Sequence, residues 1–283
     1  MSISIGKAIA EGAQVLRAAG VADARRESAS LAAHAIGRDR TYVVTHADEL
    51  WQSEKVEAFR KLIERRAKGE PLQYITGHQE FFKLDFEVTP DVLIPRPETE
   101  LLVEIALELL KDDHSPFIGD IGTGSGCIAI SVLHELGNAR AIATDISPDA
   151  LRVARRNAER HGVGDRLLLI ESDCFSALDS KNPLSLVASN PPYIRDDEME
   201  TLQREVRYEP RSALAGGRDG LDIVRRLLHE VAAFLRPSGH FVFEIGFGQD
   251  AAVEQLINAR VWELKEMRRD LQGIARAVVL RKK

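Results

Sequence analysis

Residues 117–130 read FIGDIGTGSGCIAI, and this stretch decides the fold of the larger part of the chain. A short apolar strand ends near Ile121, and an apolar helix begins at Cys127. The glycines between them let the backbone turn sharply and approach a ligand closely, while the start of the helix offers free N–H groups. The spacing G-x-G-x-G differs from the G-x-G-x-x-G of dinucleotide sites and from the phosphate-binding P-loop. The sequence therefore predicts a loop for a nucleotide-like cofactor, or alternatively a purely structural turn, made of Gly122, Thr123, Gly124, Ser125 and Gly126.

Short apolar strands alternate with helices from residue 117 onward. This alternation predicts an α/β domain with a mostly parallel sheet and helices on both of its faces. The expected strands cover residues 117–121, 139–145, 166–172, 185–189, 240–246 and 275–280. The expected helices cover residues 127–136, 148–160 and 221–235.

The first 80 residues are rich in alanine and have a helical period. We expect helices over residues 5–19, 24–36 and 54–68, each followed by a glycine that favours a C-terminal cap. Apolar residues at positions 82, 84, 86 and 88 then alternate with charged ones, which is typical of a half-buried strand in a hairpin or linker. The predicted organisation is a helical domain over residues 1–80, a hairpin linker over 81–95 and a larger α/β domain over 96–283.

Length and composition limit the class of protein. The chain has 283 residues, which fits one large domain or two of modest size. Hydrophobic residues make up 44% and charged residues 29%, so intrinsic disorder is excluded as the main state. The apolar runs are shorter than the roughly 18 to 20 residues that span a membrane, and the N-terminus does not resemble a signal peptide. We therefore expect a cytoplasmic protein without a membrane partner.

Charge and cysteine content argue against two further classes. Lys and Arg total 38 against 44 Asp and Glu, which gives a net charge of −6. This charge argues against a protein that mainly binds long stretches of nucleic-acid backbone. The acidity lies beyond residue 80, because residues 1–80 carry 12 Lys and Arg against 11 Asp and Glu. Cys127 and Cys174 lack the spacing of zinc or redox motifs, and the histidines form no HExxH pattern. We expect neither a structural disulfide nor a metal site.

Acidic residues follow the second and third expected strands. Asp145 ends the second strand, where its carboxylate can accept both hydroxyls of a ribose. A helix-capping or surface aspartate is the alternative for Asp145. Asp173 and Cys174 follow the third strand and in the same layout face the base of the cofactor, although an aspartate after a strand is also an ordinary turn residue.

The segment Ser189-Asn190-Pro191-Pro192-Tyr193 follows the fourth strand. Its two prolines lack amide hydrogens, fix their own φ and force Asn190 into an extended conformation. The Asn190 side chain and the Pro191 carbonyl can together accept the two hydrogens of a planar NH2 group, while the Tyr193 ring covers its face. The alternative is a rigid loop with a packed tyrosine.

These motifs resemble those of class I S-adenosylmethionine-dependent methyltransferases, in the branch that methylates planar exocyclic or amide nitrogens. Nearly end to end, the chain is similar to the PrmC/HemK family of release factor glutamine N5-methyltransferases. The segments that carry this resemblance are EPLQYITG (70–77), FFKLDFEV (81–88), VLIPRPETE (92–100), DIGTGSGCIAI (120–130), SNPPYI (189–194), YEPRSALAGGRDGL (208–221) and FEIGFGQ (243–249).

The resemblance implies a Rossmann-like, seven-stranded sheet and a helical N-terminal domain that docks the substrate, or else only stabilises the chain as a cap. It implies methylation of the glutamine amide in the Gly-Gly-Gln motif of class-1 peptide chain release factors, with S-adenosyl-L-methionine as cofactor and S-adenosyl-L-homocysteine as product. Cofactor contacts fall on the Gly122–Gly126 loop, Asp145, Asp173, Cys174 and Asn190. Cysteine at position 174 departs from relatives that have an aromatic residue beside the adenine.

On the substrate side, the resemblance implies catalytic roles for Asn190, Pro191 and Tyr193 and substrate contacts for these residues and Pro192. Arg96 and Glu98 resemble family residues at the entrance of the active site, with an Arg–Glu surface pair as the alternative. Two other functions stay open at this point. One is methylation of adenine N6 or guanine N2 in nucleic acid. The other is a non-catalytic binding module that retains the fold.

Overall fold

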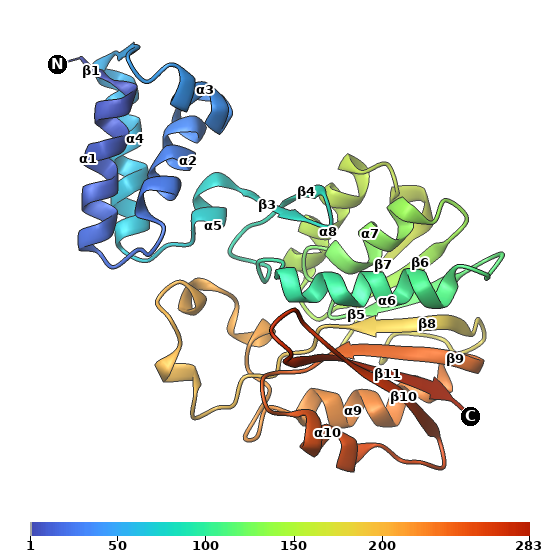
Figure 1. Ribbon diagram of the computed structural model, residues 1–283. Helices are drawn as coiled ribbons and strands as arrows, with labels where there is room; N and C mark the ends of the chain where they lie inside the picture. The colour runs from blue at the N-terminus through green and yellow to red at the C-terminus, as the bar shows by residue number, and fades with distance from the viewer. Residues whose placement is uncertain (1) are drawn as a thin grey trace. The chain divides into compact units, whose positions relative to one another are not determined.

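The computed structural model describes residues 2–283 (Figure 1). The chain forms two compact units. One unit comprises the chain up to His78 together with Gln203–Tyr208, and the other comprises Gln79–Leu202 with Glu209–Lys283. The predicted domains were contiguous in sequence, so the inclusion of the short segment 203–208 in the N-terminal unit is a difference from that prediction.

The N-terminal unit is built from helices around one apolar core. Its helices are α1 (Ile5–Ala18), α2 (Ala24–Ile36), α3 (Arg40–Thr45), α4 (Ser53–Ala67) and α5 (Leu72–Thr76), and the two-residue strands β1 (Ile3–Ser4) and β2 (Leu50–Trp51) pair antiparallel. The three long helices match the predicted ones, and Gly20 and Gly37 have the positive φ expected of residues that end helices. The sequence analysis missed α3 and α5, which are too short to show a clear helical repeat of apolar residues.

Segment 203–208 is held in this unit by polar contacts from α4 and the residues that follow it. The Arg66 guanidinium donates to Glu27 at 2.5 Å and to Glu205 at 2.9 Å, and its side chain is buried. Arg204 donates to the carbonyl oxygen of Ala67 at 3.2 Å. These contacts join parts of the chain more than 130 residues apart, which explains why sequence order did not reveal them.

The larger unit is a seven-stranded sheet with the order β10-β11-β9-β8-β5-β6-β7. Strand β11 runs in the direction opposite to the other six strands. Its strands are β5 (Phe117–Ile121), β6 (Arg140–Asp145), β7 (Leu167–Glu171), β8 (Leu184–Ser189), β9 (Leu235–Glu244), β10 (Trp262–Arg269) and β11 (Ala275–Lys282). The predicted mostly parallel, seven-stranded architecture is confirmed.

Successive strand residues face two separate apolar cores. Val242 faces one core and its neighbours Phe241 and Phe243 face the other, because side chains alternate along a strand. Figure 1 shows α6, α7 and α8 on one face of the sheet and α9 and α10 on the other. These helices are α6 (Glu100–Leu110), α7 (Cys127–Glu135), α8 (Pro148–Arg160), α9 (Asp222–Glu230) and α10 (Asp250–Leu256). The unit also has the 3-10 turns η1 (Pro97–Thr99), η2 (Gly164–Arg166), η3 (Met199–Thr201), η5 (Arg211–Ala213) and η6 (Val231–Ala233), whereas η4 (Val206–Tyr208) belongs to the N-terminal unit.

Three local expectations differ from the structure. The alternating run from position 82 is not one strand, because Phe82 and Lys83 have positive φ and form the turn between β3 (His78–Phe81) and β4 (Leu84–Glu87). The helix expected over 221–235 ends earlier, and Leu235 already belongs to β9. Strand β10 and helix α10 were not anticipated individually. Among residues 2–283, no helix is long and apolar enough to cross a membrane.

Strands β5 and β8 are neighbours at the centre of the sheet, and the chain continues from β5 to one side and reaches β8 on the other. In parallel sheets this change of direction opens a crevice at the carboxyl ends of the strands, where ligands bind. Both the Gly122–Gly126 loop and the Asn190–Tyr193 loop follow strands that end at this point. The fold therefore brings the two predicted functional loops together.

Packing in the N-terminal unit gives a testable prediction at Gly12 of α1. A Cβ atom there would lie 2.6 Å from Ser28 Oγ and 2.7 Å from Phe59 Cζ. Gly12→Ala gains about 1 kcal/mol of helix propensity, but overpacking a core costs about 1–3 kcal/mol. We expect a net loss of up to about 2 kcal/mol in the free energy of unfolding, measured by urea unfolding with circular dichroism.

Gly137→Ala is the control, since a Cβ at Gly137 meets nothing within 4 Å and its φ is not positive. We expect its free energy of unfolding to stay within about 0.5 kcal/mol of the wild-type value. Equal stability of the two variants would show that α1 does not pack as closely as the structure has it.

Candidate active site

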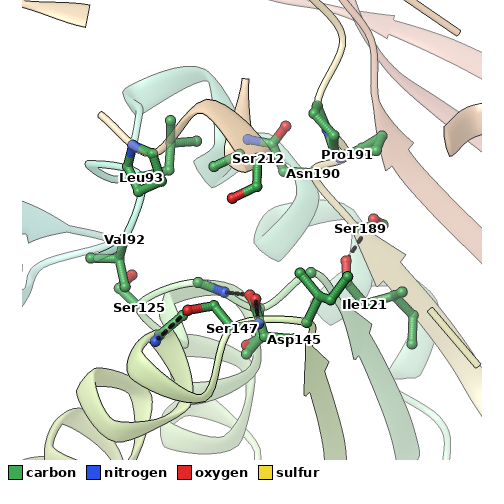
Figure 2. Close-up of a pocket in the computed structure, with 18 of the residues that line it drawn as sticks. Val92, Leu93, Ile121, Ser125, Asp145, Ser147, Ser189, Asn190, Pro191 and Ser212 are labelled. Atoms are coloured by element: carbon green, nitrogen blue, oxygen red, sulfur yellow. Dashed lines mark hydrogen bonds between the residues drawn. The ribbon is translucent and has the colours of Figure 1, made fainter. Parts of the chain in front are cut away.

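A pocket of about 240 Å3 lies at the carboxyl ends of β5, β6, β7 and β8 (Figure 2). Most of the predicted site residues line it, namely Arg96, Gly122, Thr123, Gly124, Ser125, Asp145, Asp173, Cys174, Asn190, Pro191 and Pro192. Three predicted residues are outside this lining: Glu98, Gly126 and Tyr193. The pocket therefore joins the predicted cofactor loop and the predicted acceptor loop in one site.

The glycine loop between β5 and α7 needs its glycines for backbone reasons. Gly122, Gly124 and Gly126 have φ values of 74°, 55° and 83°, a region that side chains other than glycine rarely adopt. A Cβ at Gly126 would also lie 2.6 Å from Ile130 Cδ1 of α7. Gly126 thus serves the start of the helix, while Gly122 and Gly124 form the pocket wall.

Asp120 lies buried beneath this loop and supports it. Its Oδ2 accepts a hydrogen bond from Thr123 Oγ1 at 2.7 Å and from the Ala129 N–H at 3.2 Å. Its Oδ1 has no partner within residues 2–283. Burial raises the pKa of Asp120 to about 6, with hydrogen bonds opposing and the charge of Asp145 adding to the shift. This carboxyl group supplies a negative charge just below the loop.

Asp145 lies at the end of β6 and binds the glycine loop directly. Its Oδ2 accepts the Gly124 N–H at 2.9 Å and its Oδ1 accepts the Ser147 N–H at 2.9 Å, as drawn in Figure 2. Each carboxylate oxygen can accept more than one hydrogen bond, so both keep capacity for a ligand. Burial raises the pKa of Asp145, while its backbone hydrogen bonds lower it. The next residue, Ile146, is 60% exposed and adds an apolar surface to the pocket.

Asp173 and Cys174 follow β7, the neighbour of β6, and line the pocket. Arg226 of α9 donates to the Asp173 carboxylate at 2.6 Å and to its carbonyl oxygen at 3.0 Å, so this carboxylate already has a partner. Cys174 has a positive φ of 51°. Burial raises the pKa of the Cys174 thiol to about 11, which keeps it neutral at physiological pH. Cys174 therefore offers a small, uncharged surface at the position where the resemblance implies an aromatic ring in some relatives.

The Asn190–Tyr193 loop follows β8. Ser189 Oγ donates to the Ile121 carbonyl at 2.7 Å and ties the end of β8 to the end of β5, as Figure 2 shows. Gln249 Nε2 donates to the Tyr193 carbonyl at 3.1 Å. In the described part of the chain, no hydrogen-bond donor is paired with Asn190 Oδ1 or with the Pro191 carbonyl. The loop is thus fixed, and two acceptors on the pocket wall remain free.

A buried polar network lies behind Asn190. Asn190 Nδ2 donates to Thr99 Oγ1 at 3.0 Å, and Thr99 Oγ1 donates to Glu244 Oε2 at 2.6 Å. The Tyr193 hydroxyl donates to Glu244 Oε1 at 3.3 Å. The prediction placed the Tyr193 ring over a substrate amide, whereas the structure keeps its hydroxyl in this network and its ring off the pocket wall.

Arg96 and Glu98 are not paired with each other. Arg96 instead donates to Glu209 Oε1, and Glu209 Oε2 accepts the Ile94 N–H at 3.0 Å. The Glu209 side chain is almost fully buried, so this contact fixes the segment that carries Arg96. Arg96 lines the pocket and Glu98 does not. The alternative prediction, a surface ion pair between Arg96 and Glu98, is therefore wrong.

Sequence reasoning missed several residues that shape the site, namely Thr99, Ile146, Asn157, Glu209 and Glu244. Asn157 of α8 is buried and donates to the Ser125 carbonyl at 2.9 Å, which anchors the glycine loop. A signal was present for Glu244, because a lone carboxylate in the apolar run FVFEIG predicts a buried, hydrogen-bonded acid. In sequence, Thr99, Asn157 and Glu209 are ordinary polar residues and Ile146 is an ordinary apolar one.

Comparisons with known proteins show similarity over both parts of the chain. Residues 7–77 match the family described as "PrmC N-terminal domain", and residues 98–217 match the "Methyltransferase small domain". A release factor glutamine methyltransferase from Nitratidesulfovibrio vulgaris is 42% identical over 272 residues, covering 95% of this chain and 92% of that protein. One from Moorella thermoacetica is 45% identical over 257 residues, covering 91% and 90%.

Among solved structures, the Thermus thermophilus 16S rRNA N2 G1207 methyltransferase (RsmC), in complex with AdoMet and guanosine, superposes with a TM-score of 0.52. The two are 16% identical, and the match covers 73% of this chain and 50% of that one, so this likeness concerns the fold alone. The relatives match both the helical unit and the α/β unit at much higher identity. The chain belongs to the family of release factor glutamine methyltransferases.

Proposed function

We propose that this chain transfers a methyl group from S-adenosylmethionine to the side-chain amide nitrogen, N5, of the glutamine in the Gly-Gly-Gln motif of class-1 peptide chain release factors. The product of the cofactor is S-adenosylhomocysteine, and the amide nitrogen releases one of its two hydrogens as a proton. One observation carries this proposal: Asn190 Oδ1 and the Pro191 carbonyl are free acceptors in the same pocket as the glycine loop. Family membership favours a protein amide over the alternative of adenine N6 or guanine N2 in nucleic acid.

The residues of the pocket fit this cofactor. Asp145 retains acceptor capacity for two ribose hydroxyls. Ile146 and the neutral Cys174 offer apolar surface to an adenine ring. When bound, S-adenosylmethionine supplies an electrophilic methyl group on a sulfonium, so the chain itself needs no nucleophile.

The chain's own residues orient the substrate nitrogen. An amide nitrogen is a poor nucleophile because its lone pair is delocalised into the carbonyl. Asn190 Oδ1 and the Pro191 carbonyl accept its two hydrogens and hold it in one orientation, which converts binding energy into a favourable reaction geometry. The same two dipoles stabilise the positive charge that grows on nitrogen during the transfer. The adjacent prolines keep both acceptors in place beforehand.

The remaining parts of the proposal concern the substrate. We assign residues 1–80 to docking the release factor, in the cytoplasm where translation terminates. This region is close to neutral in charge, which suits a protein partner better than a nucleic acid. Arg96 on the pocket wall and Glu98 near it are assigned to the border of the substrate entrance. Pro192, which lines the pocket beside Pro191, completes the substrate loop.

The test is mass spectrometry of a class-1 release factor incubated with the full chain and S-adenosylmethionine. We expect one added methyl group on the glutamine of the Gly-Gly-Gln motif. A release factor with that glutamine replaced is the control and should stay unmodified. Duplex DNA and ribosomal RNA are incubated in parallel with a methyl-labelled cofactor. Labelling of either nucleic acid instead of the release factor would contradict the proposal.

Asn190→Ala tests the acceptor role of the loop. We expect kcat to fall by roughly 10²- to 10³-fold, as when one preorganised hydrogen-bonding group is removed from a transition state. Cofactor affinity should change only moderately, because Asp145 and the glycine loop are intact. Steady-state kinetics and calorimetry measure the two quantities. Asn182→Ala, at an exposed asparagine before β8, is the matched control and should retain wild-type kcat.

Asp145→Asn tests the cofactor site. The change removes the charge and turns one of two acceptors into a donor that faces a backbone N–H. Hydrogen bonds to charged groups contribute about 1.5–3 kcal/mol, so we expect the Kd for S-adenosylmethionine to rise roughly tenfold to a hundredfold. Isothermal titration calorimetry measures it. Asp149→Asn, in the first turn of α8 and outside the pocket lining, should bind as the wild type does; an unchanged Kd for Asp145→Asn would refute the assignment.

A further inference from the structure

The network behind Asn190 joins three parts of the chain that are far apart in sequence. Thr99 comes from η1, Glu244 is the last residue of β9, and Asn190 with Tyr193 follows β8. Thr99 and Glu244 are both almost fully buried, at 2% and 1% exposure. Neither residue lies in the proposed transfer step itself. Thr99 also contributes to the pocket lining, whereas Glu244 does not, and the hydrogen bonds of this pair lead to Asn190 and Tyr193.

The hydrogen bonds of this network have a defined direction. A threonine hydroxyl carries one hydrogen, and Thr99 donates it to Glu244 Oε2 at 2.6 Å. Only lone pairs of Thr99 Oγ1 remain for Asn190, so the Asn190 side chain must present its NH2 group, as it does at 3.0 Å. The Oδ1 of the same amide is then left on the other side, free of partners in the described chain.

The opposite arrangement would disable the acceptor. If Thr99 donated to Asn190, the amide would turn over and bring its own NH2 group toward the substrate NH2 group. Two donors would then face each other without an acceptor, and the desolvation cost of such an unpaired group is about 1–3 kcal/mol. The direction of the Thr99 hydrogen bond therefore decides whether Asn190 can bind a substrate amide.

We propose that Thr99 and Glu244 are positioning residues for the reaction: the Glu244 carboxylate takes the single hydroxyl hydrogen of Thr99 and thereby holds Asn190 with its Oδ1 toward the substrate. This inference rests on the proposed function, because it assigns Asn190 to the substrate amide. It extends that function to Glu244, which lies outside the pocket lining, and to the hydroxyl of Thr99, which bonds both Glu244 and Asn190. Tyr193 donates to the second oxygen of Glu244 and keeps the carboxylate in place.

The proposed arrangement depends on the ionisation of Glu244. Burial raises its pKa to about 7, the charge of Glu98 raises the pKa further, and hydrogen bonds from Thr99 and Tyr193 and the charge of Arg276 lower it. Cys127 is the other titratable group that interacts with this charge. Below its pKa Glu244 is itself a donor, so Thr99 no longer has to donate to it and Asn190 loses its fixed orientation. Activity should therefore rise as pH rises through about 7.

The first test needs no substrate or cofactor. The chain has five asparagines, so ¹⁵N labelling of asparagine in the full-length protein gives few side-chain amide signals, and Asn190→Ala identifies the signal of Asn190. We expect the Asn190 amide signal to titrate with a midpoint near pH 7 in the wild type. Glu244→Gln should abolish this titration, because glutamine offers Thr99 an acceptor at every pH. Loss of the titration supports the proposal even if release factor methylation fails.

The second test uses kinetics once wild-type methylation has been established. Thr99→Val removes the hydroxyl at nearly constant volume, and we expect kcat to fall roughly tenfold to a hundredfold with little change in KM for the release factor. Thr99→Ser restores the hydroxyl and should recover most of kcat. Glu244→Gln should retain kcat at pH 8 within roughly tenfold and lose the rise through pH 7.

Ser185→Ala is the matched control. Ser185 Oγ donates to the Asp113 carboxylate at 2.8 Å, so the variant removes a hydroxyl–carboxylate bond of the same kind at the opposite end of β8. It should keep the wild-type kcat and pH profile, and thermal unfolding verifies that every variant folds. A folded Thr99→Val with wild-type kcat, or an Asn190 signal that still titrates near pH 7 in Glu244→Gln, would overturn the proposal.

Discussion

The pairing of β5 with β8 is the constraint on which the site depends. Gly119 faces Val187 across these strands, and a Cβ at Gly119 would lie 2.9 Å from Leu184 Cδ1. The close approach lets the ends of both strands meet, and the Ser189 hydroxyl then binds the Ile121 carbonyl at 2.7 Å. One loop after β5 forms the cofactor wall, and one loop after β8 forms the acceptor wall. Their spacing is therefore set by a strand pair, not by the loops.

The site concentrates carboxyl groups that the fold must stabilise. Asp120, Glu209 and Glu244 are all buried, and burying a charge is costly unless hydrogen bonds compensate. Glu209 has Arg96 and a backbone N–H as partners, whereas within residues 2–283 no cation is in hydrogen-bonding contact with Asp120 or Glu244. Burial raises their pKa values, to about 6 for Asp120 and about 7 for Glu244. Raised pKa values at buried acids are typical of functional sites, and both groups adjoin the two walls of the pocket.

How far the fold could be predicted depended on whether each signal was local. The strands and helices from residue 117 onward were found because buried parallel strands are short, uniformly apolar runs. Strand β10 was not, because an irregularity between Leu264 and Glu266 interrupts its alternation and most of its residues are charged or polar. The turn of the β3–β4 hairpin was not anticipated either, since Phe82 and Lys83 adopt positive φ without glycine or asparagine. Tertiary packing of the hairpin overrides the local preference there.

The candidate site divides in the same way. The positive φ values of the glycine loop and the extended conformation of Asn190 depend on residues that are adjacent in sequence. Both loops could therefore be predicted from the sequence. The contacts that orient these loops are not local. Asn190 forms a hydrogen bond with Thr99, 91 residues away in sequence, and Thr99 forms one with Glu244, 145 residues away. A threonine and a glutamate carry no mark of such a partner. The groups that contact a substrate can thus be read from short motifs, whereas the direction of the hydrogen bonds that make them effective emerges only when the fold assembles distant residues.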